Sequence, residues 1–212
     1  MEIDLKNYNP DVRHVNDMEE VMYDQAWVED TVNTDLYYMY RKLKIENELR
    51  YDITIIPPKM LGQEFVKTKG HIHQGFYGEV YMVLEGEGIY LAQKGDENNI
   101  EDVVVTHGKT GDVILIPAGY GHVTINPGKG QLKTANWIAE RDQGDFSLFE
   151  RNQGACYYYI AAPSTGSTSS LQAGSGQAGQ WIKNPRYQNV PELRFEEPLK
   201  EVPQNLDFLK AK

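Results

Sequence analysis

The sequence predicts an all-β fold, either an antiparallel barrel or a sandwich, with an extension at each end. Between Asp35 and Ala162, short runs of β-branched and aromatic residues alternate with turn residues. No amphipathic helical segment separates these runs, which argues against a sheet built from alternating strands and helices. Hydrophobic residues make up 40% of the 212 residues, enough to fill a core.

Eight or nine strands follow from this pattern. Each run is short, apolar or alternating, and bounded by Gly, Pro, Asn or Asp, and the expected strands cover 36–45, 51–57, 79–86, 88–95, 102–108, 112–119, 122–128, 132–139 and 155–162. The segment Gly86-Glu87-Gly88 joins two of them. Because glycine adopts the positive φ that tight turns require, we expect a hairpin at this point.

Composition divides the chain into four parts. Residues 1–34 are a polar N-terminal extension, and residues 35–162 hold the predicted strands. Residues 163–180 form a Ser/Gly-rich linker, whose composition buries too little apolar area to offset its ordering entropy. Residues 181–212 form a tail punctuated by proline. We therefore expect one compact domain with two extensions.

The two extensions carry apolar residues of their own. In the first, Asn16 or Asp17 could cap a short helix whose buried side would present Met18, Val21, Met22 and Trp27. The tail keeps four large apolar residues, Trp181, Tyr187, Leu193 and Phe195. The tail is therefore expected to lie extended across the barrel or across a neighbouring subunit.

Charge and cysteine content exclude several classes of protein. The formal net charge is −10, whereas nucleic-acid binding needs a basic surface. Any anionic ligand must then be held by a local cluster of donors. The single cysteine, Cys156, excludes an intrachain disulfide, and its apolar surroundings favour a buried structural thiol. Without a signal-peptide pattern or a long apolar run, the expected location is the cytoplasm, away from membranes.

Four residues have the types and spacing of metal ligands. His71 and His73 are two apart, so on a strand both imidazoles face the same side, and Glu79 follows past a short turn. Taken alone, the His-x-His pair could equally be a chance pair on a solvated strand. His122, which follows a strand and a Pro-Ala-Gly turn, supplies a fourth ligand. Three imidazoles and one carboxylate suit a divalent first-row metal with room for substrate oxygens.

These motifs resemble those of the cupin family. The segment Gly70 to Gly86, with its two histidines, its glutamate and its closing glycine, resembles the first cupin motif. The segment Gly111 to Asn126 matches the second motif, G-x5-P-x-G-x2-H-x3-N, at every defined position. The resemblance implies a double-stranded β-helix, or jelly-roll, barrel with the metal inside it.

More narrowly, residues 35–160 are similar to the cupin-type glucose-6-phosphate isomerases. That family builds its phosphate site from positions that match Tyr37, Thr54, Thr68 and Gly70 here. These groups offer hydroxyl donors and a backbone N–H, which could hold a phosphate without a strongly basic surface. Each residue alone has an ordinary structural interpretation as a strand, turn or core residue. The stretch IAERDQGDF lacks the His and Tyr that some relatives place near the substrate.

The resemblance implies an isomerase that interconverts glucose-6-phosphate and fructose-6-phosphate. We expect one divalent metal per subunit, Fe²⁺ in the first place, with Mn²⁺, Ni²⁺ or Zn²⁺ as alternatives. Glu79 is the candidate base as well as a ligand, and Tyr81, on the same strand face, could orient Glu79 or the substrate. Proton transfer through a cis-enediol and a metal-assisted hydride shift both remain open.

Other functions are compatible with the same ligands. A cupin iron dioxygenase would use three histidines and a glutamate with an oxidisable substrate and oxygen, and a metal- or sugar-binding cupin would do no chemistry. Mannose-6-phosphate or a pentose without phosphate could also replace glucose-6-phosphate. The family resemblance further implies a homodimer.

Overall fold

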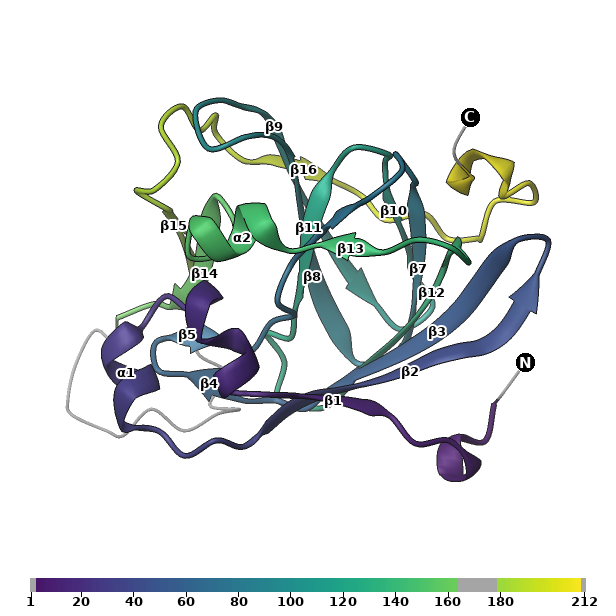
Figure 1. Ribbon diagram of the computed structural model, residues 1–212, viewed down its shortest axis with the longest axis horizontal. Helices are drawn as coiled ribbons and strands as arrows, with labels where there is room; N and C mark the ends of the chain where they lie inside the picture. Colours follow the sequence, from purple (N-terminus) through teal and green to yellow (C-terminus); the bar gives the residue numbers. More distant parts are fainter. Residues whose placement is uncertain (1–2, 164–178, 211–212) are drawn as a thin grey trace.

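The computed structural model describes residues 3–163 and 179–210, and its core is a barrel of two facing β sheets (Figure 1). The larger sheet is antiparallel throughout and has the strand order β1 (Asp11–His14), β2 (Asp35–Glu46), β3 (Leu49–Ile56), β12 (Leu132–Ala139), β7 (Glu79–Glu85) and β10 (Val113–Ile116). The predicted all-β barrel is confirmed.

The facing sheet and two smaller sheets complete the strands. The facing sheet has the order β11 (Gly121–Ile125), β8 (Glu87–Gly95), β9 (Ile100–Lys109) and β16 (Arg194–Glu196). The smaller sheets are β13 (Gly144–Asp145) with β6 (Ile72–His73), and β15 (Gly179–Lys183), β14 (Tyr157–Ala161), β5 (Glu64–Phe65) and β4 (Met60–Leu61) in that order. Among all these pairs, only β16 and β9 run parallel.

The hydrophobic core fills the space between the two main sheets. Leu91, Val105 and Val123 from the facing sheet and Ile114 from the larger sheet are all buried. Alternate residues of each strand point inward, so the two sheets bury their apolar faces against each other. This packing fixes the inner walls from which the site residues project.

The nine predicted strands all correspond to observed strands, but the predicted hairpin at Gly86-Glu87-Gly88 is wrong. The preceding strand, β7, pairs with β10 and β12, whereas the following strand, β8, pairs with β9 and β11. Gly86 has φ +80° and is a corner at which the chain passes from one sheet to the other. The glycine signal identified a sharp turn, but a turn does not specify which strand becomes the partner.

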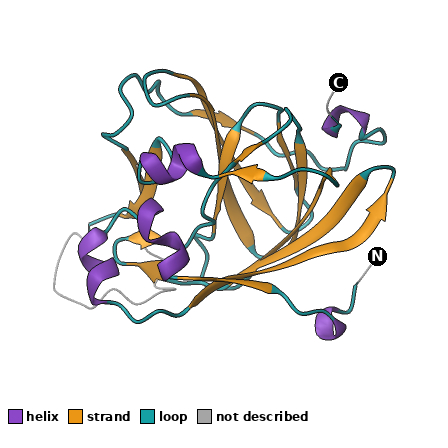
Figure 2. Cartoon of the chain, in the orientation of Figure 1, coloured by secondary structure: helices purple, strands orange, loops and turns teal. Residues whose placement is uncertain are grey.

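The helices are short and stand mostly at one end of the barrel (Figure 2). They are η1 (Leu5–Asn7), η2 (Asn16–Val21), α1 (Gln25–Asp30), α2 (Ser147–Arg151) and η3 (Asp207–Leu209). The single N-terminal helix expected from the sequence is in fact two elements, η2 and α1. Neither predicted cap is used as expected, because the Asp24 side chain caps α1 through the N–H of Trp27, and Asp17 accepts from His14.

The tail packs along the barrel, as Figure 1 shows for β15 and β16. Tyr187 is buried and Trp181 packs against the core, whereas Phe195 in β16 is 60% exposed. Most of the predicted Ser/Gly linker, residues 164–178, lies outside the described residues. Cys156 is buried as expected, and burial raises the pKa of its thiol. Within the described ranges, no helix is long and apolar enough to cross a membrane.

Candidate metal centre and active site

The four predicted metal ligands converge inside the barrel. His71 precedes β6, His73 lies in β6, Glu79 begins β7 and His122 lies in β11. Their candidate ligand atoms all lie within 4.8 Å of one another. The Oε2 atom of Glu79 is 3.1 Å from Nε2 of His73 and 3.1 Å from Nε2 of His122. The barrel therefore brings together residues up to 51 positions apart, with His71 and His122 also bonded through their backbones.

Burial and crowding set the charges of the cluster. Burial, together with the nearby His122 and His73, holds the pKa of His71 well below its usual value. Burial alone would raise the pKa of Glu79, but hydrogen bonds from His122 and His73 outweigh it and hold that pKa well below the usual range. A neutral imidazole and an ionised carboxylate are the forms that bind metals.

The donor set fits a divalent first-row metal. Three imidazoles and one carboxylate are borderline ligands, and four protein ligands leave coordination positions for substrate oxygens on an octahedral ion. Tyr81 lies beside them, with its hydroxyl 3.0 Å from Nε2 of His122. Burial and the charge of Glu79 raise the pKa of Tyr81 well above its usual value, so the phenol keeps its proton.

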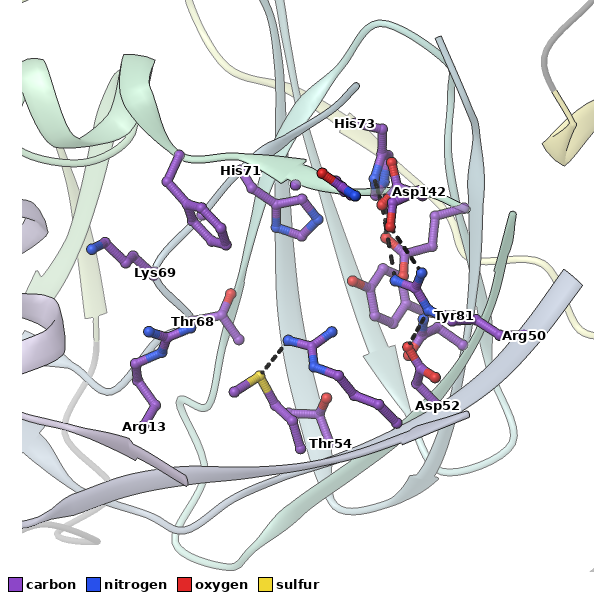
Figure 3. Close-up of a pocket in the computed structure, with 18 of the residues that line it drawn as sticks. Arg13, Arg50, Asp52, Thr54, Thr68, Lys69, His71, His73, Tyr81 and Asp142 are labelled. Atoms are coloured by element: carbon purple, nitrogen blue, oxygen red, sulfur yellow. Dashed lines mark hydrogen bonds and ion pairs between the residues drawn. The ribbon is translucent and has the colours of Figure 1, made fainter. Parts of the chain in front are cut away.

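A cavity of about 410 Å³ opens onto the cluster (Figure 3). Its wall contains eight of the nine residues that the sequence singled out, namely Tyr37, Thr54, Thr68, Gly70, His71, His73, Glu79 and Tyr81. The ninth, His122, adjoins the cavity through the cluster. The structure thus brings the predicted phosphate residues and the predicted metal ligands to one space.

Hydrogen-bond donors line one end of this cavity. The N–H of Thr124 donates to Oγ1 of Thr68 over 2.9 Å, so the Thr68 hydroxyl proton remains for another acceptor. The N–H of Lys69 donates to the Tyr37 hydroxyl over 3.1 Å. Burial raises the pKa of Tyr37 in spite of the opposing charge of Arg13, so this hydroxyl also keeps its proton.

Gly70 and Thr54 complete the donor-lined end of the cavity. Gly70 has φ +85°, and a Cβ there would lie 2.6 Å from side-chain atoms of Phe149 and Val123. Only glycine fits this close approach. Thr54 lies on β3, opposite Thr134 of β12, and forms part of the cavity wall.

Two arginines at the donor-lined end of the cavity were missed by the sequence analysis. Arg13 lies on β1 opposite Tyr37, and its Nε is buried without a hydrogen-bond partner among the residues described. Arg41 lies on β2, where it pairs with Asp11 and donates to the sulfur of Met39. Although the whole chain is acidic, this end of the cavity is locally basic. Figure 3 shows Arg13 beside Thr68.

An ionic network was missed at the other end of the cavity. Arg50 and Asp52, both buried, are 2.9 Å apart between Nε and Oδ2, and Asp52 also accepts from the backbone N–H of Lys42. Asp142, in the connection between β12 and β13, lies 3.0 Å from Nδ1 of His73 through its Oδ2. Burial lowers the pKa of His73, but the carboxylates of Asp142 and Glu79 outweigh it and raise that pKa to about 9.

A sequence signal existed for part of this network. Arg50, Asp52 and Thr54 alternate along β3 and so share one strand face. A row of polar residues facing inward is unusual for a barrel strand and could have indicated a site. Arg13 and Asp142 gave no such signal, because only strand pairing and a loop bring them to the cavity.

An antiparallel barrel that encloses three imidazoles and a carboxylate defines a metal-binding protein of the cupin type. The family model for glucose-6-phosphate isomerase (GPI) matches residues 12–172, and the chain belongs to that family.

Curated relatives agree with this assignment. Glucose-6-phosphate isomerase of Thermococcus litoralis is 32% identical over 133 residues, which cover 58% of this chain and 66% of the relative. The Pyrococcus furiosus enzyme is 34% identical over 126 residues, which cover 55% of this chain and 63% of the relative. The chain therefore spans slightly less than two thirds of the length of the curated relatives it matches.

Solved structures that align with this chain are more distant. A predicted oxalate decarboxylase from Thermotoga maritima aligns with a TM-score of 0.41 and 19% identity, over 65% of this chain and 96% of that one. Hazelnut (Corylus avellana) vicilin aligns with a TM-score of 0.41 and 14% identity, over 54% of this chain and 33% of that one.

Proposed function

We propose that this chain is a metal-dependent aldose–ketose isomerase that interconverts glucose-6-phosphate and fructose-6-phosphate. The observation that carries the proposal is that one cavity joins the His/Glu cluster to an end lined by hydroxyls and arginines. The curated relatives are glucose-6-phosphate isomerases, which supports the same reaction.

In this proposal the donor-lined end of the cavity binds the phosphate. Tyr37, Thr54 and Thr68 supply hydroxyls and Gly70 supplies close backbone approach. Arg13, which the sequence did not indicate, adds a positive group whose Nε is buried and has no hydrogen-bond partner among the described residues. Charge-assisted hydrogen bonds of this kind hold a phosphate in spite of an acidic molecular surface.

His71, His73, Glu79 and His122 would hold one divalent metal, and we propose Fe²⁺, with Mn²⁺, Ni²⁺ and Zn²⁺ as functional substitutes. When bound, the metal supplies Lewis acidity toward the oxygens of the open-chain sugar. The three imidazoles and the carboxylate are buried or partly buried, so little water competes for these ligands.

Glu79 is the proposed base that removes the C2 proton, and Tyr81 is the proposed orienting donor. Both contacts of Glu79 to imidazole nitrogens use Oε2, which leaves Oε1 as the oxygen for proton transfer. Tyr81 is protonated and lies two residues further along the same face of β7. A hydride shift from C2 to C1 would need neither a base at Glu79 nor an orienting donor at Tyr81.

The test is conversion of fructose-6-phosphate to glucose-6-phosphate, coupled to a glucose-6-phosphate dehydrogenase, on chelator-treated protein before and after metal is added. Restored turnover supports the proposal, and inactivity with Fe²⁺, Mn²⁺, Ni²⁺ and Zn²⁺ refutes it. H122Q should lose metal and activity, whereas the matched change at the exposed His107, H107Q, should lose neither.

The base is tested separately. E79Q should lower turnover more than metal content, while E85Q, at the exposed end of the same strand, should change neither. Full activity of metal-loaded E79Q would remove Glu79 as the base and favour the hydride shift. Oxygen consumption with an oxidisable substrate would instead indicate a dioxygenase, and sugar binding without turnover a binding protein.

We extend the proposal to a homodimer. Its support is that Tyr8, Phe195 and Phe208 expose much of their apolar surface on a single chain. Sedimentation velocity at two protein concentrations should give the mass of two chains. A single-chain mass at both would refute it.

A further inference from the structure

Asp142 occupies a buried position between the metal ligands and the cavity. It lies in the connection between β12 and β13, its side chain is 2% exposed, and it belongs to the cavity wall. Figure 3 shows it next to His73, across the cavity from Arg13 and Thr68. A carboxylate so deeply buried needs a partner for each of its oxygens.

The first oxygen, Oδ2, contacts His73. It lies 3.0 Å from Nδ1, while Nε2 of the same ring lies 3.1 Å from Glu79 within the ligand cluster. Because Asp142 accepts at Nδ1, a proton stays on that nitrogen, and Nε2 is the nitrogen that offers its lone pair when a metal replaces the proton shared with Glu79. Carboxylates that orient a ligand histidine in this way strengthen metal binding.

The second oxygen, Oδ1, is buried and has no hydrogen-bond partner in the described part of the chain. An unpaired buried acceptor costs roughly 1–3 kcal/mol, and more when it is charged. A hydroxyl group from a ligand in the cavity would supply the missing donor. An open-chain sugar offers several such hydroxyls.

Arg50 holds Asp142 in this position. Its Nη1 donates to the backbone oxygen of Asp142 over 3.0 Å and to that of Glu140 over 3.1 Å, and its Nη2 lies 3.9 Å from Oδ2 of Asp142. Asp52 in turn fixes the guanidinium. The connection that carries Asp142 is therefore anchored to β3, and the carboxylate is preorganised before any ligand binds.

We propose that Asp142 has two roles, one toward the metal ligand His73 and one toward the sugar. Oδ2 positions His73, and Oδ1 accepts a hydrogen bond from a hydroxyl at the end of the open-chain sugar opposite the phosphate. The second role rests on the proposed phosphosugar substrate, whereas the first requires only a metal.

Three variants separate the two roles. D142N can still accept from Nδ1 of His73 through its amide oxygen, but it presents an NH₂ group where Oδ1 accepted. D142A removes both acceptors. D145N is the matched control, because Asp145 is three residues away and its Oδ1 accepts from the N–H of Ser147.

The first measurement is the metal dissociation constant, by competition with a chelator and without sugar. D142A should weaken metal binding about 10- to 100-fold, whereas D142N and D145N should stay within about threefold, a spread of less than 1 kcal/mol. Wild-type affinity in D142A would overturn the positioning role. If D142A does not fold, the ¹⁵N spectrum of Zn²⁺-loaded wild-type protein tests the positioning role instead. Metal bound at Nδ1 of His73 would overturn that role.

The second measurement is binding of glucitol 6-phosphate, an open-chain polyol phosphate that cannot isomerise, by calorimetry on metal-loaded protein. D142N should bind glucitol 6-phosphate at least about tenfold more weakly than the wild type does, because a hydrogen bond to a charged acceptor is lost. Its KM for fructose-6-phosphate should rise as well. Unchanged binding in D142N would overturn the sugar role. If the wild type binds the polyol but turns over no sugar, the isomerase proposal fails while both roles of Asp142 stand.

Discussion

Replacing Arg13 by methionine should weaken recognition of a phosphosugar far more than recognition of the same sugar without its phosphate. The Arg13 side chain lies in the cavity wall with its Nε buried and unpaired among the described residues. Its strand contact to Tyr37 is made by the backbone, so R13M should leave β1 in place. Methionine keeps much of the apolar length of the side chain and removes its charge.

The size of the effect follows from the kind of bond that is lost. A hydrogen bond to a charged group contributes about 1.5–3 kcal/mol, which corresponds to about 10- to 150-fold in affinity. We expect kcat/KM for fructose-6-phosphate to fall by that factor in R13M. The reaction of fructose, which lacks the phosphate, should change by less than about twofold, because an energy below 0.5 kcal/mol is within the range of surface substitutions.

The assay compares both sugars with wild type, R13M and the control R186M. Arg186 is exposed and bonds to Gln153, outside the cavity. A fall in kcat/KM that is equal for fructose and fructose-6-phosphate would refute a phosphate-specific role for Arg13. So would an unchanged value for both sugars.

Three further predictions concern stability. Lys67 and Glu64 form a buried ion pair 2.5 Å apart, so K67M should lower the free energy of unfolding in urea by about 3–5 kcal/mol, and the double variant with E64Q should lose less than the sum of the single changes. G86A should cost about 1–3 kcal/mol in the same measurement, because residue 86 has φ +80° and a Cβ there would collide with a backbone carbonyl; a wild-type midpoint would contradict the corner geometry. Asp102 has its pKa held below its usual 3.8, chiefly by a hydrogen bond from Arg194, so this pair stabilises the fold fully above the unfolded pKa and loses that contribution as pH falls through the lower folded pKa. The difference in unfolding midpoint between wild type and R194M should therefore shrink from about pH 5 downward, and a constant difference would exclude this linkage.

The strand pattern was predictable because it depends on local chemistry. The runs of β-branched and aromatic residues coincide with strands, since such residues fit the half-buried surface of a sheet. The convergence of the candidate ligands His71 and His73 was predictable for a related reason, because a two-residue spacing on a strand directs both side chains to one side. The second motif then supplied His122, which the barrel brings into the same cluster.

Strand pairing was not predictable from the same information. The turn at Gly86 was correctly located, yet the strands on either side belong to different sheets. A positive φ fixes the direction in which the chain turns, but the partners are chosen by which apolar faces can be buried together. The N-terminal helix also differs from its prediction. Asp24, rather than Asn16 or Asp17, provides the cap of α1.

The sequence by itself determined the all-β class, the strand positions and the four candidate metal ligands, because each depends on residue type and on spacings of a few residues. Only the tertiary structure decided that Arg13 and Asp142 belong to the same cavity as those ligands. Arg13 reaches it because β1 pairs with β2, and Asp142 because Arg50 anchors the connection after β12. Contacts between distant segments depend on which surfaces bury one another, and neither local propensity nor spacing encodes that choice.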